Sequence, residues 1–576
     1  MNKNTIIDIK ITDIAEDGSG IGRFENMVVF VRGMLPGEYG EVLIIKVTKS
    51  YAIGKLQKLI EASPDRITPP SCENFSKGCG GCTFCHFSYE GQLKYKENRV
   101  VDCLTRIGGF ESISEITKQI IPSVDIHDYR NKSIYPFGID SKGNIICGFY
   151  ASASHRIIPI QSDGCGLEND MSRKIREFTI AYVQSNNFSI YNEEKGTGFL
   201  RALMVRTNSI FPKEAMVVLI VNGSEKDLDI LKNYALALNK ELPFTVSIYA
   251  CFNTKNTNIL LNGKLCLLYG KETISDVIGS FDGAPTFDIS PLSFFQINPR
   301  QTERLYDAVY DALPKDSNKL GLIYDIYCGI GTIGLYLLSR LRKDSTCGCH
   351  FSNVPPDKKM LVGVEYVASA VENAKKNALH NGFGSVADFY QGDAGAITPV
   401  VLEKYGSPSV IILDPPRKGC DEALINTVLS ANAEYVIYVS CNPATLARDL
   451  KQLCSEKYEC VSVQPVDMFP QCGHVETVVL LSKLNTKQHI AINLDMDELD
   501  LSDAEKKATY QEIKDYVLEH SGLKVSSLYI AQVKQKCGII ERDNYNKPKS
   551  KDAKQPQCPP DKEKAIKVAL RHFGMI

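Results

Sequence analysis

Residues 324–334 read Tyr-Asp-Ile-Tyr-Cys-Gly-Ile-Gly-Thr-Ile-Gly, a run typical of a nucleotide-binding α/β sheet. The apolar start predicts a buried strand, the glycines predict a tight turn, and a helix is expected after the turn. Gly329, Gly331 and Gly334 match the fingerprint of a dinucleotide site. The next strand-like run, residues 360–365, ends on Glu365, an acid that suits a ribose diol in a nicotinamide or an adenosylmethionine site.

Asp325 decides between these two cofactors. An acid directly before the turn repels a pyrophosphate, but it can help to hold an ammonium group through water or backbone. This favours the aminoacyl end of S-adenosylmethionine. Asp393 ends a third predicted strand and is placed to meet the adenine amine. The sequence therefore predicts a methyltransferase, with a nicotinamide-dependent oxidoreductase as the alternative.

Two further strands carry reactive side chains at their ends. Val410-Ile-Ile-Leu413 runs into Asp414-Pro-Pro-Arg417, and Tyr435-Val-Ile-Tyr-Val439 runs into Ser440-Cys-Asn-Pro443. Because ligand crevices lie outside the carboxyl ends of parallel strands, we expect Asp414 and Cys441 at one edge. A carboxylate beside a thiol suggests covalent catalysis, although a buried free cysteine is more often inert packing.

The length of 576 residues predicts several domains. Residues 1–60 alternate apolar and polar residues between glycine turns, which predicts a small β-barrel of the OB type. Residues 61–290 predict a cysteine-rich loop, a helix over 88–108 and an α+β domain. Residues 291–483 predict a doubly wound parallel sheet, and residues 484–576 a small helical module. Helix-turn-helix-like character and lysines that could meet RNA phosphates suggest an accessory RNA-docking role for that module.

Composition places the chain in a reducing compartment. The polar start Met1-Asn-Lys-Asn4 predicts no signal peptide, and no apolar run reaches membrane-spanning length. Nineteen cysteines without an export signal therefore predict a cytoplasmic protein without a disulfide framework. The net charge of -2 neither requires nor excludes nucleic acid. We expect a monomer.

Cys72, Cys79, Cys82 and Cys85 lie within fourteen residues of a Gly-rich loop. Close thiolates on such a loop can reach one soft metal centre. A structural zinc site would use four local ligands, whereas an iron–sulfur cluster often takes three close cysteines and a distant one, for which Cys165 is available. The spacing alone leaves both open.

Taken in order, seven motifs resemble those of the RNA uracil-C5-methyltransferase family, in its bacterial form with an N-terminal TRAM domain. The motifs are Cys72/Cys79/Cys82/Cys165, Tyr129-Arg-Asn-Lys132, Ser293-Phe-Phe-Gln-Ile-Asn298, Asp325-Ile-Tyr-Cys-Gly329, Asp414-Pro-Pro-Arg417, Ser440-Cys-Asn-Pro-Ala-Thr445 and Gly473-His-Val-Glu476. The resemblance covers residues 1 to about 483 and implies 5-methyluridine formation with S-adenosylmethionine.

The resemblance also implies roles for individual residues. Cys441 would be the nucleophile and Glu476 the proton acceptor, with His474 a weaker choice. Cys72, Cys79, Cys82 and Cys165 would hold a [4Fe–4S] cluster. The methyl-donor site would be lined by Gln296, Tyr327, Thr332, Glu365, Asp393 and Asp414. Ribosomal RNA of the 23S type is the expected substrate and transfer RNA the second; a non-catalytic RNA-binding module would leave Cys441 and Glu476 unexplained.

Three departures from the family pattern accompany the resemblance: Thr332 where relatives often carry Asn, the extra thiol of Cys85, and a longer loop over 341–360 that holds Cys347 and Cys349. We also expect Arg448 to serve RNA or the helix surface, with part of a positive field at Cys441 as its alternative role. The hypothetical RNA contacts are Arg130, Lys132, Arg201 and Arg206.

Overall fold

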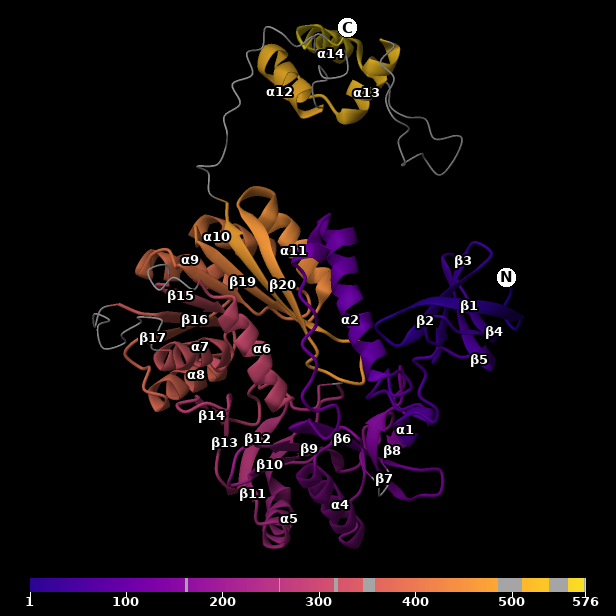
Figure 1. Ribbon diagram of the computed structural model, residues 1–576, viewed down its shortest axis with the longest axis vertical. Coiled ribbons are helices and arrows are strands. Elements are labelled where there is room, and N and C mark those ends of the chain that lie inside the picture. Colours follow the sequence, from indigo (N-terminus) through magenta and orange to yellow (C-terminus); the bar gives the residue numbers. More distant parts are fainter. Residues whose placement is uncertain are drawn as a thin grey trace. The chain divides into compact units, whose positions relative to one another are not determined.

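The computed structural model describes residues 1–160, 164–257, 259–314, 320–344, 358–484, 510–537, 558–573 and 575. The chain forms two compact units, Met1–Leu484 and Asn485–Ile576 (Figure 1). The expected loop around Cys347 and Cys349 lies outside the described residues, as does Ser502-Asp-Ala-Glu505, a capping box that predicts the start of a helix.

The N-terminal strands close into a barrel in the order β1-β2-β3-β5-β4, which confirms the predicted β-barrel. Its strands are β1 (Ile6–Ile14), β2 (Ser19–Phe24), β3 (Met27–Arg32), β4 (Tyr39–Val47) and β5 (Tyr51–Glu61). Side chains of β1 alternate between exposed and buried, as a half-buried strand requires. Gly54 is needed inside the barrel, because a Cβ there would lie 2.2 Å from Cγ1 of Val42.

A cysteine-rich loop and a long helix follow the barrel. The helices of this segment are α1 (Glu73–Ser76), α2 (Tyr89–Cys103), η1 (Leu104–Gly108) and α3 (Ile113–Ile116). The Ser88 side chain caps α2 by accepting from the Gly91 N–H, and Gly109 ends η1 in the left-handed region. Val100 and Leu104 pack into a core shared with the C-terminal α/β sheet of the first unit.

The central sheet has seven strands in the order β12-β11-β10-β9-β6-β7-β8. Its elements are β6 (Lys132–Ile139), β7 (Ile145–Tyr150), β8 (Ile157–Pro159), α4 (Asp170–Ser185), β9 (Leu200–Thr207), β10 (Ala215–Val221), η2 (Glu225–Asp227), α5 (Leu228–Glu241), β11 (Thr245–Phe252) and β12 (Lys264–Gly270). Leu203 and Val205 of β9 face the helices α4 and α5, whereas Ala202 and Met204 face the neighbouring domain. Both faces of this sheet are therefore covered.

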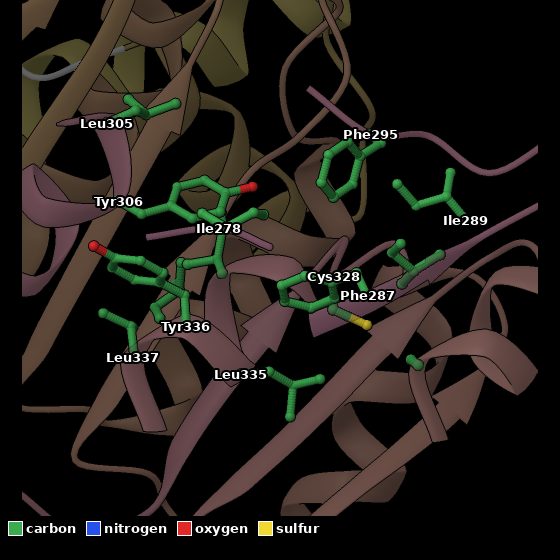
Figure 2. Packing of buried hydrophobic residues seen from close by; sticks show 14 of the residues in the cluster. Ile278, Phe287, Ile289, Phe295, Leu305, Tyr306, Cys328, Leu335, Tyr336 and Leu337 are labelled. Carbon is green, nitrogen blue, oxygen red and sulfur yellow. The ribbon is translucent and has the colours of Figure 1, made fainter. Parts of the chain in front are cut away.

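A short hairpin, β13 (Ile274–Val277) with β14 (Thr286–Ile289), leads into the α/β sheet. Figure 2 shows the core at this junction, where Phe287 and Phe295 lie near Tyr306, Tyr336 and Cys328. One hydrophobic core thus joins the central sheet to the sheet that follows.

The α/β sheet has seven strands in the order β17-β16-β15-β18-β19-β21-β20. Its elements are α6 (Pro299–Asp311), β15 (Ile323–Ile326), α7 (Thr332–Lys343), β16 (Leu361–Glu365), α8 (Ala368–His380), β17 (Ala387–Gln391), α9 (Ala394–Tyr405), β18 (Val410–Leu413), α10 (Glu422–Ala431), β19 (Tyr435–Ser440), α11 (Pro443–Glu456), β20 (Tyr458–Val466) and β21 (Glu476–Lys483). Strands β15 to β19 are parallel, and β21 runs antiparallel between β19 and β20. The strand order reverses between β15 and β18, where such sheets bind ligands.

The second unit contains α12 (Tyr510–Ser521), α13 (Ser527–Lys536) and α14 (Pro560–His572), as expected for a helical module. Ile513, Ile530 and Ile566 contribute one residue from each helix to its core. Lys534 is buried and is therefore not open to RNA phosphates, whereas Lys536 is exposed and pairs with Glu563. No helix in the described ranges is long and apolar enough to cross a membrane.

A buried ion pair fixes α2 to the loop after β20. Lys96 Nζ lies 2.5 Å from Oδ1 of Asp467 and donates to the Phe469 carbonyl at 2.9 Å. The Tyr89 hydroxyl donates to the other Asp467 oxygen at 2.8 Å. Both charged side chains are fully buried, so each needs its partner.

Lys96→Ala should destabilise the first unit by about 3–5 kcal/mol, because it leaves the Asp467 carboxylate buried without its cation. Lys94→Ala, on the exposed face of the same helix, should change the free energy of unfolding by less than about 0.5 kcal/mol. Urea unfolding followed by circular dichroism measures both variants. Equal effects of the two substitutions would contradict this account of the pair.

Candidate functional site

The turn after β15 provides a cradle of the kind expected for a nucleotide-like cofactor. Tyr327, Gly329 and Gly331 have positive φ angles of 68°, 57° and 82°. The N–H groups of Tyr327 and Cys328 donate to the Val364 carbonyl, which fixes the turn to β16. A Cβ at Gly329 would meet nothing within 4 Å, so open space lies beside this turn. These features suit the methyl donor that the sequence predicts.

Asp325 faces the protein rather than the open space. One of its carboxylate oxygens accepts from the Gly334 N–H at 3.0 Å, and the other is buried without a hydrogen-bond partner. Burial, and then the charge of Glu365, raise the pKa of Asp325 to about 7. Its carboxyl therefore ties β15 to the first turn of α7 and is only partly ionised at neutral pH.

Glu365 and Asp393 end neighbouring strands on the same side of the cradle. Glu365 accepts from the N–H groups of Gly329 at 3.1 Å and Val367 at 2.8 Å. Asp393 caps α9 by accepting from Gly395 and Ala396. The Gly392 N–H bonds the Glu365 carbonyl at 2.9 Å, which holds the two loops together.

Thr332 begins α7 directly after the cradle, and Gln296 lies in the segment before α6. The Thr332 hydroxyl accepts from the Tyr306 hydroxyl of α6 at 2.9 Å. Gln296 is buried, and its main-chain carbonyl accepts from the Asn131 side chain at 2.9 Å. Burial, followed by the charges of Asp414, Asp325 and Glu476, raises the pKa of Tyr306, which places this tyrosine among the acids of the site. Sequence reasoning did not identify Tyr306.

The pairing of β19 with β21 brings Cys441 and Glu476 together. Ser440 pairs with Thr477 in the antiparallel register, so Cys441 and Glu476 are the next residues along their strands. Asp414 follows β18, the other neighbour of β19, and its N–H donates to the Ile326 carbonyl. The structure therefore brings a thiol and two carboxyl groups to one sheet edge.

Glu476 is buried, Cys441 and Asp414 are partly exposed, and the three groups disfavour one another's charge. Burial, then the charges of Glu476 and Asp414, raise the pKa of Cys441 to about 11. Burial, then Asp414, raises the pKa of Glu476 to about 8, and burial, then Asp325, raises that of Asp414 to about 7. Two acids with raised pKa values beside a thiol are typical of an active site.

Arg417, not Arg448, supplies the positive charge at Cys441. The Arg417 charge opposes the rise in the pKa of both Cys441 and Glu476. Arg448 instead donates to the carbonyls of Lys418 and Cys420 and pairs with Asp449, so it braces the loop after Arg417. The alternative role of Arg448, a positive field at Cys441, is thus filled by Arg417, and helical spacing did not reveal the loop contact of Arg448.

The loop before Glu476 is held from several sides. Gln471 has a φ of 68°, and its carbonyl accepts from the N–H groups of Thr83 and Phe84 in the cysteine-rich loop. The Tyr129 hydroxyl donates to the Pro470 carbonyl at 3.1 Å. Nδ1 of His474 lies 2.8 Å from the Glu16 carboxylate, so that nitrogen is not free to serve as a base. The cysteine-rich loop and the Tyr129 motif thus both position the strand that carries Glu476.

The predicted cluster cysteines surround one small cavity. Cys72, Cys79, Cys82 and Cys165 line a space of about 60 Å³ together with Arg130. Cys85 is buried behind it, in hydrogen-bond contact with Cys72 and Cys82. In the described part of the chain, however, no three His, Cys, Asp or Glu side chains have the arrangement of a metal-ion site. The four thiols are gathered, but the predicted cluster is not established by their positions.

Two of the expected RNA-contacting arginines are buried. Arg201 donates to the carbonyls of Asn253 and Lys255, and Arg206 donates to the Ser293 carbonyl. Both are at most 5% exposed, so the prediction that they contact RNA was wrong. Lys132 is partly buried, and burial and Arg206 lower its pKa to about 8. Arg130 lines the cysteine cavity instead of a free surface.

Comparison with known proteins agrees with this geometry. A family model described as tRNA (uracil-5-)-methyltransferase matches residues 262–484, and a TRAM domain model matches residues 2–56. An uncharacterized RNA methyltransferase of Clostridium tetani is 38% identical over 488 residues, which cover 85% of this chain and 98% of that protein. One from Halalkalibacterium halodurans is 38% identical over 488 residues, covering 84% of this chain and 98% of its own length.

A solved structure is similar as well. The tRNA (uracil-54, C5)-methyltransferase of Pyrococcus abyssi, in complex with S-adenosyl-L-homocysteine, is 26% identical with a TM-score of 0.61. The match covers 82% of this chain and all of that one.

Proposed function

This chain belongs to the RNA uracil-5-methyltransferase family, whose members transfer a methyl group from S-adenosylmethionine, and we propose that it does so by covalent catalysis through Cys441. The observation that carries the proposal is the placement of Cys441 beside Glu476 and Asp414 at the carboxyl edge of the sheet. A passive RNA-binding surface gives no reason to place two carboxyl groups with raised pKa values around a thiol. A nicotinamide-dependent oxidoreductase is disfavoured by the family membership.

The methyl donor would sit over the turn at Gly329. When bound, S-adenosylmethionine supplies an electrophilic methyl group. Glu365 would hold the ribose, Tyr327 and Gln296 would line the methyl-donor pocket, and Thr332 and Asp393 would lie toward the start of α7 and the adenine. The N-cap residue of α7, Gly331, has no capping side chain, and apart from the Gly334 N–H bonded by Asp325 the first-turn N–H groups would be available to the aminoacyl carboxylate.

Cys441 adds through its thiolate to C6 of the target uracil and makes C5 nucleophilic toward the methyl group. Glu476 then takes the proton from C5, and the bond between Cys441 and C6 breaks. The raised pKa of Glu476, about 8, lies near neutral pH and makes the ionised form of this carboxyl group a strong proton acceptor. Asp414, when protonated, can donate a hydrogen bond to the uracil edge while negative charge develops on the ring.

The target uridine must leave its stack to reach this edge. Cys441 is only partly exposed, and a stacked base cannot present C6 to it. Unpaired uridines of loops or bulges are therefore the proposed targets. We favour 23S ribosomal RNA, as the sequence motifs do, with transfer RNA as the alternative that the Pyrococcus abyssi enzyme supports.

The four cavity-lining cysteines are proposed to hold a [4Fe–4S] cluster. Four thiols around one small space match the donor set of such a cluster. In that role the cluster would fix the loop whose Thr83 and Phe84 N–H groups hold Gln471, and so would help to position Glu476. Methyl transfer itself needs no electrons, which makes this a structural role.

Incubation with tritiated methyl donor and unmodified 23S ribosomal RNA or transfer RNA should give labelled 5-methyluridine with the wild type. Cys441→Ala should give none, and Glu476→Gln should lower turnover by about 10²–10⁴-fold, because the C5 proton then lacks its acceptor. Cys460→Ala and Glu459→Gln, on β20 of the same sheet, serve as matched controls and should keep full activity. Label in the Cys441→Ala product, or methylation elsewhere than C5, would contradict the mechanism.

Protein purified without oxygen should contain iron and acid-labile sulfide in equal amounts. Cys82→Ala should lose both, since it removes a ligand. Cys85→Ala should keep the iron, because Cys85 does not line the cavity. Bound zinc without sulfide would contradict the cluster and support the structural zinc site instead.

A further inference from the structure

A turn of the N-terminal barrel reaches the loop that precedes Glu476. The turn lies between β1 and β2 and is closed by bonds from Ala15 to Ser19 and from Gly18 to Ala15. A Cβ at Gly473 would lie 2.5 Å from the Glu16 carbonyl oxygen, so the two backbones touch and only glycine fits. This turn is therefore an immediate neighbour of His474.

Glu16, in that turn, carries a carboxylate that bonds two side chains, one on each oxygen. One oxygen lies 2.8 Å from Nδ1 of His474, and the other lies 2.5 Å from Arg99 of α2. The His474 hydrogen bond, followed by the hydrogen bond and the charge of Arg99, lowers the pKa of Glu16 to about 2. Arg99 also donates to the Gly473 carbonyl at 3.1 Å. Glu16 is thus ionised and fixed in place at neutral pH.

His474 can satisfy both of its neighbours in a single neutral tautomer. A proton on Nδ1 donates to Glu16, which leaves the Nε2 lone pair facing NH2 of Arg417 at 3.5 Å. A carboxylate that holds one imidazole nitrogen orients whatever the other nitrogen binds, as it does at metal sites. The Glu16 carboxylate therefore determines that Nε2, and not Nδ1, of His474 accepts from Arg417.

Arg417 is fastened to the nucleophile loop through its main chain. Its carbonyl accepts from the Asn442 side chain and from the Thr445 hydroxyl, both at 3.2 Å. Asn442 directly follows Cys441, and His474 lies two residues before Glu476. The side chain of Arg417 thus runs from the loop of the thiol to the loop of the base. Because this side chain is exposed, a partner is needed to restrict its rotamers.

We propose that Glu16 is a positioning residue for methyl transfer: through His474 it keeps the Arg417 guanidinium within electrostatic reach of Cys441 and Glu476. This inference rests on the proposed function, and it gives the barrel a part in the chemistry besides any contact with RNA. Arg417 favours the thiolate of Cys441, and Glu16 acts on that thiolate only by holding His474.

The test is the pH dependence of Cys441 alkylation by iodoacetamide, followed on the Cys441 peptide by mass spectrometry, in the RNA-free enzyme. Glu16→Ala should raise the pH midpoint of alkylation by about 0.5–1 unit, because the Arg417 guanidinium is then less often near the Cys441 thiolate. Arg417→Ala should raise it at least as much, and the double variant should add nothing further, since both changes remove one effect. Glu16→Gln, which keeps an acceptor for Nδ1, should lie between Glu16→Ala and the wild type.

Asp17→Asn is the matched control, because Asp17 lies in the same turn but accepts from the Ser19 N–H instead of bonding His474 or Arg99. It should leave the midpoint unchanged. In turnover with RNA, Glu16→Ala should lower kcat by about tenfold per unit of pKa change, with KM for the methyl donor unchanged. An unchanged alkylation midpoint in Glu16→Ala, or additive effects in the double variant, would overturn the proposal. Since alkylation needs no RNA, failure to form 5-methyluridine would instead count against the proposed function.

Discussion

The antiparallel insertion of β21 between β19 and β20 is the constraint on which the site depends. In a purely parallel sheet, every strand would present its carboxyl end at the ligand edge. Because β21 runs the other way, its first residue, Glu476, lies at that edge beside the last residues of β19. A thiol from a strand end and a carboxyl group from a strand start thus meet without a long loop, and the backbone ladder fixes their spacing.

Placing several acids at this edge is electrostatically unfavourable for their ionised forms. Cys441, Glu476, Asp414 and Asp325 all have raised pKa values, chiefly because burial disfavours their charged forms. Such an arrangement makes proton transfer easy near neutral pH but disfavours the thiolate. Arg417 offsets part of this effect. The loop that precedes Glu476 is in turn held by α2, the cysteine-rich loop and the barrel turn, so elements far apart in the sequence support one small group of side chains.

The sequence predicted the parts of the site that depend on local pattern. Strand ends mark Asp325, Glu365, Asp414 and Cys441 directly, because a short apolar run followed by a polar residue and a turn is typical of a buried strand that ends at the sheet edge. The closed barrel followed in the same way from the alternation of apolar and polar residues between glycine turns.

Contacts between distant segments could not be predicted. Arg201 and Arg206 looked like surface charges in the sequence. In the structure all eight residues of β9 are buried, and both arginines bond carbonyls inside the protein. Likewise, nothing near Glu16 in the sequence indicates that it meets His474, because this contact exists only after the barrel has docked. Arg417 stood within a recognised motif, but its neighbours in space were needed to distinguish it from Arg448.

The central claim is that Cys441 forms a covalent bond with a uridine of RNA, and an adduct measures this most directly. RNA transcripts in which 5-fluorouridine replaces uridine lack the C5 proton that Glu476 would remove, so the adduct should persist after the methyl group has been transferred. After digestion, mass spectrometry should find a methylated 5-fluorouridine attached to the peptide that contains Cys441. An adduct on another cysteine, or methyl transfer to unmodified RNA with no adduct formed on the fluorinated RNA, would contradict the account.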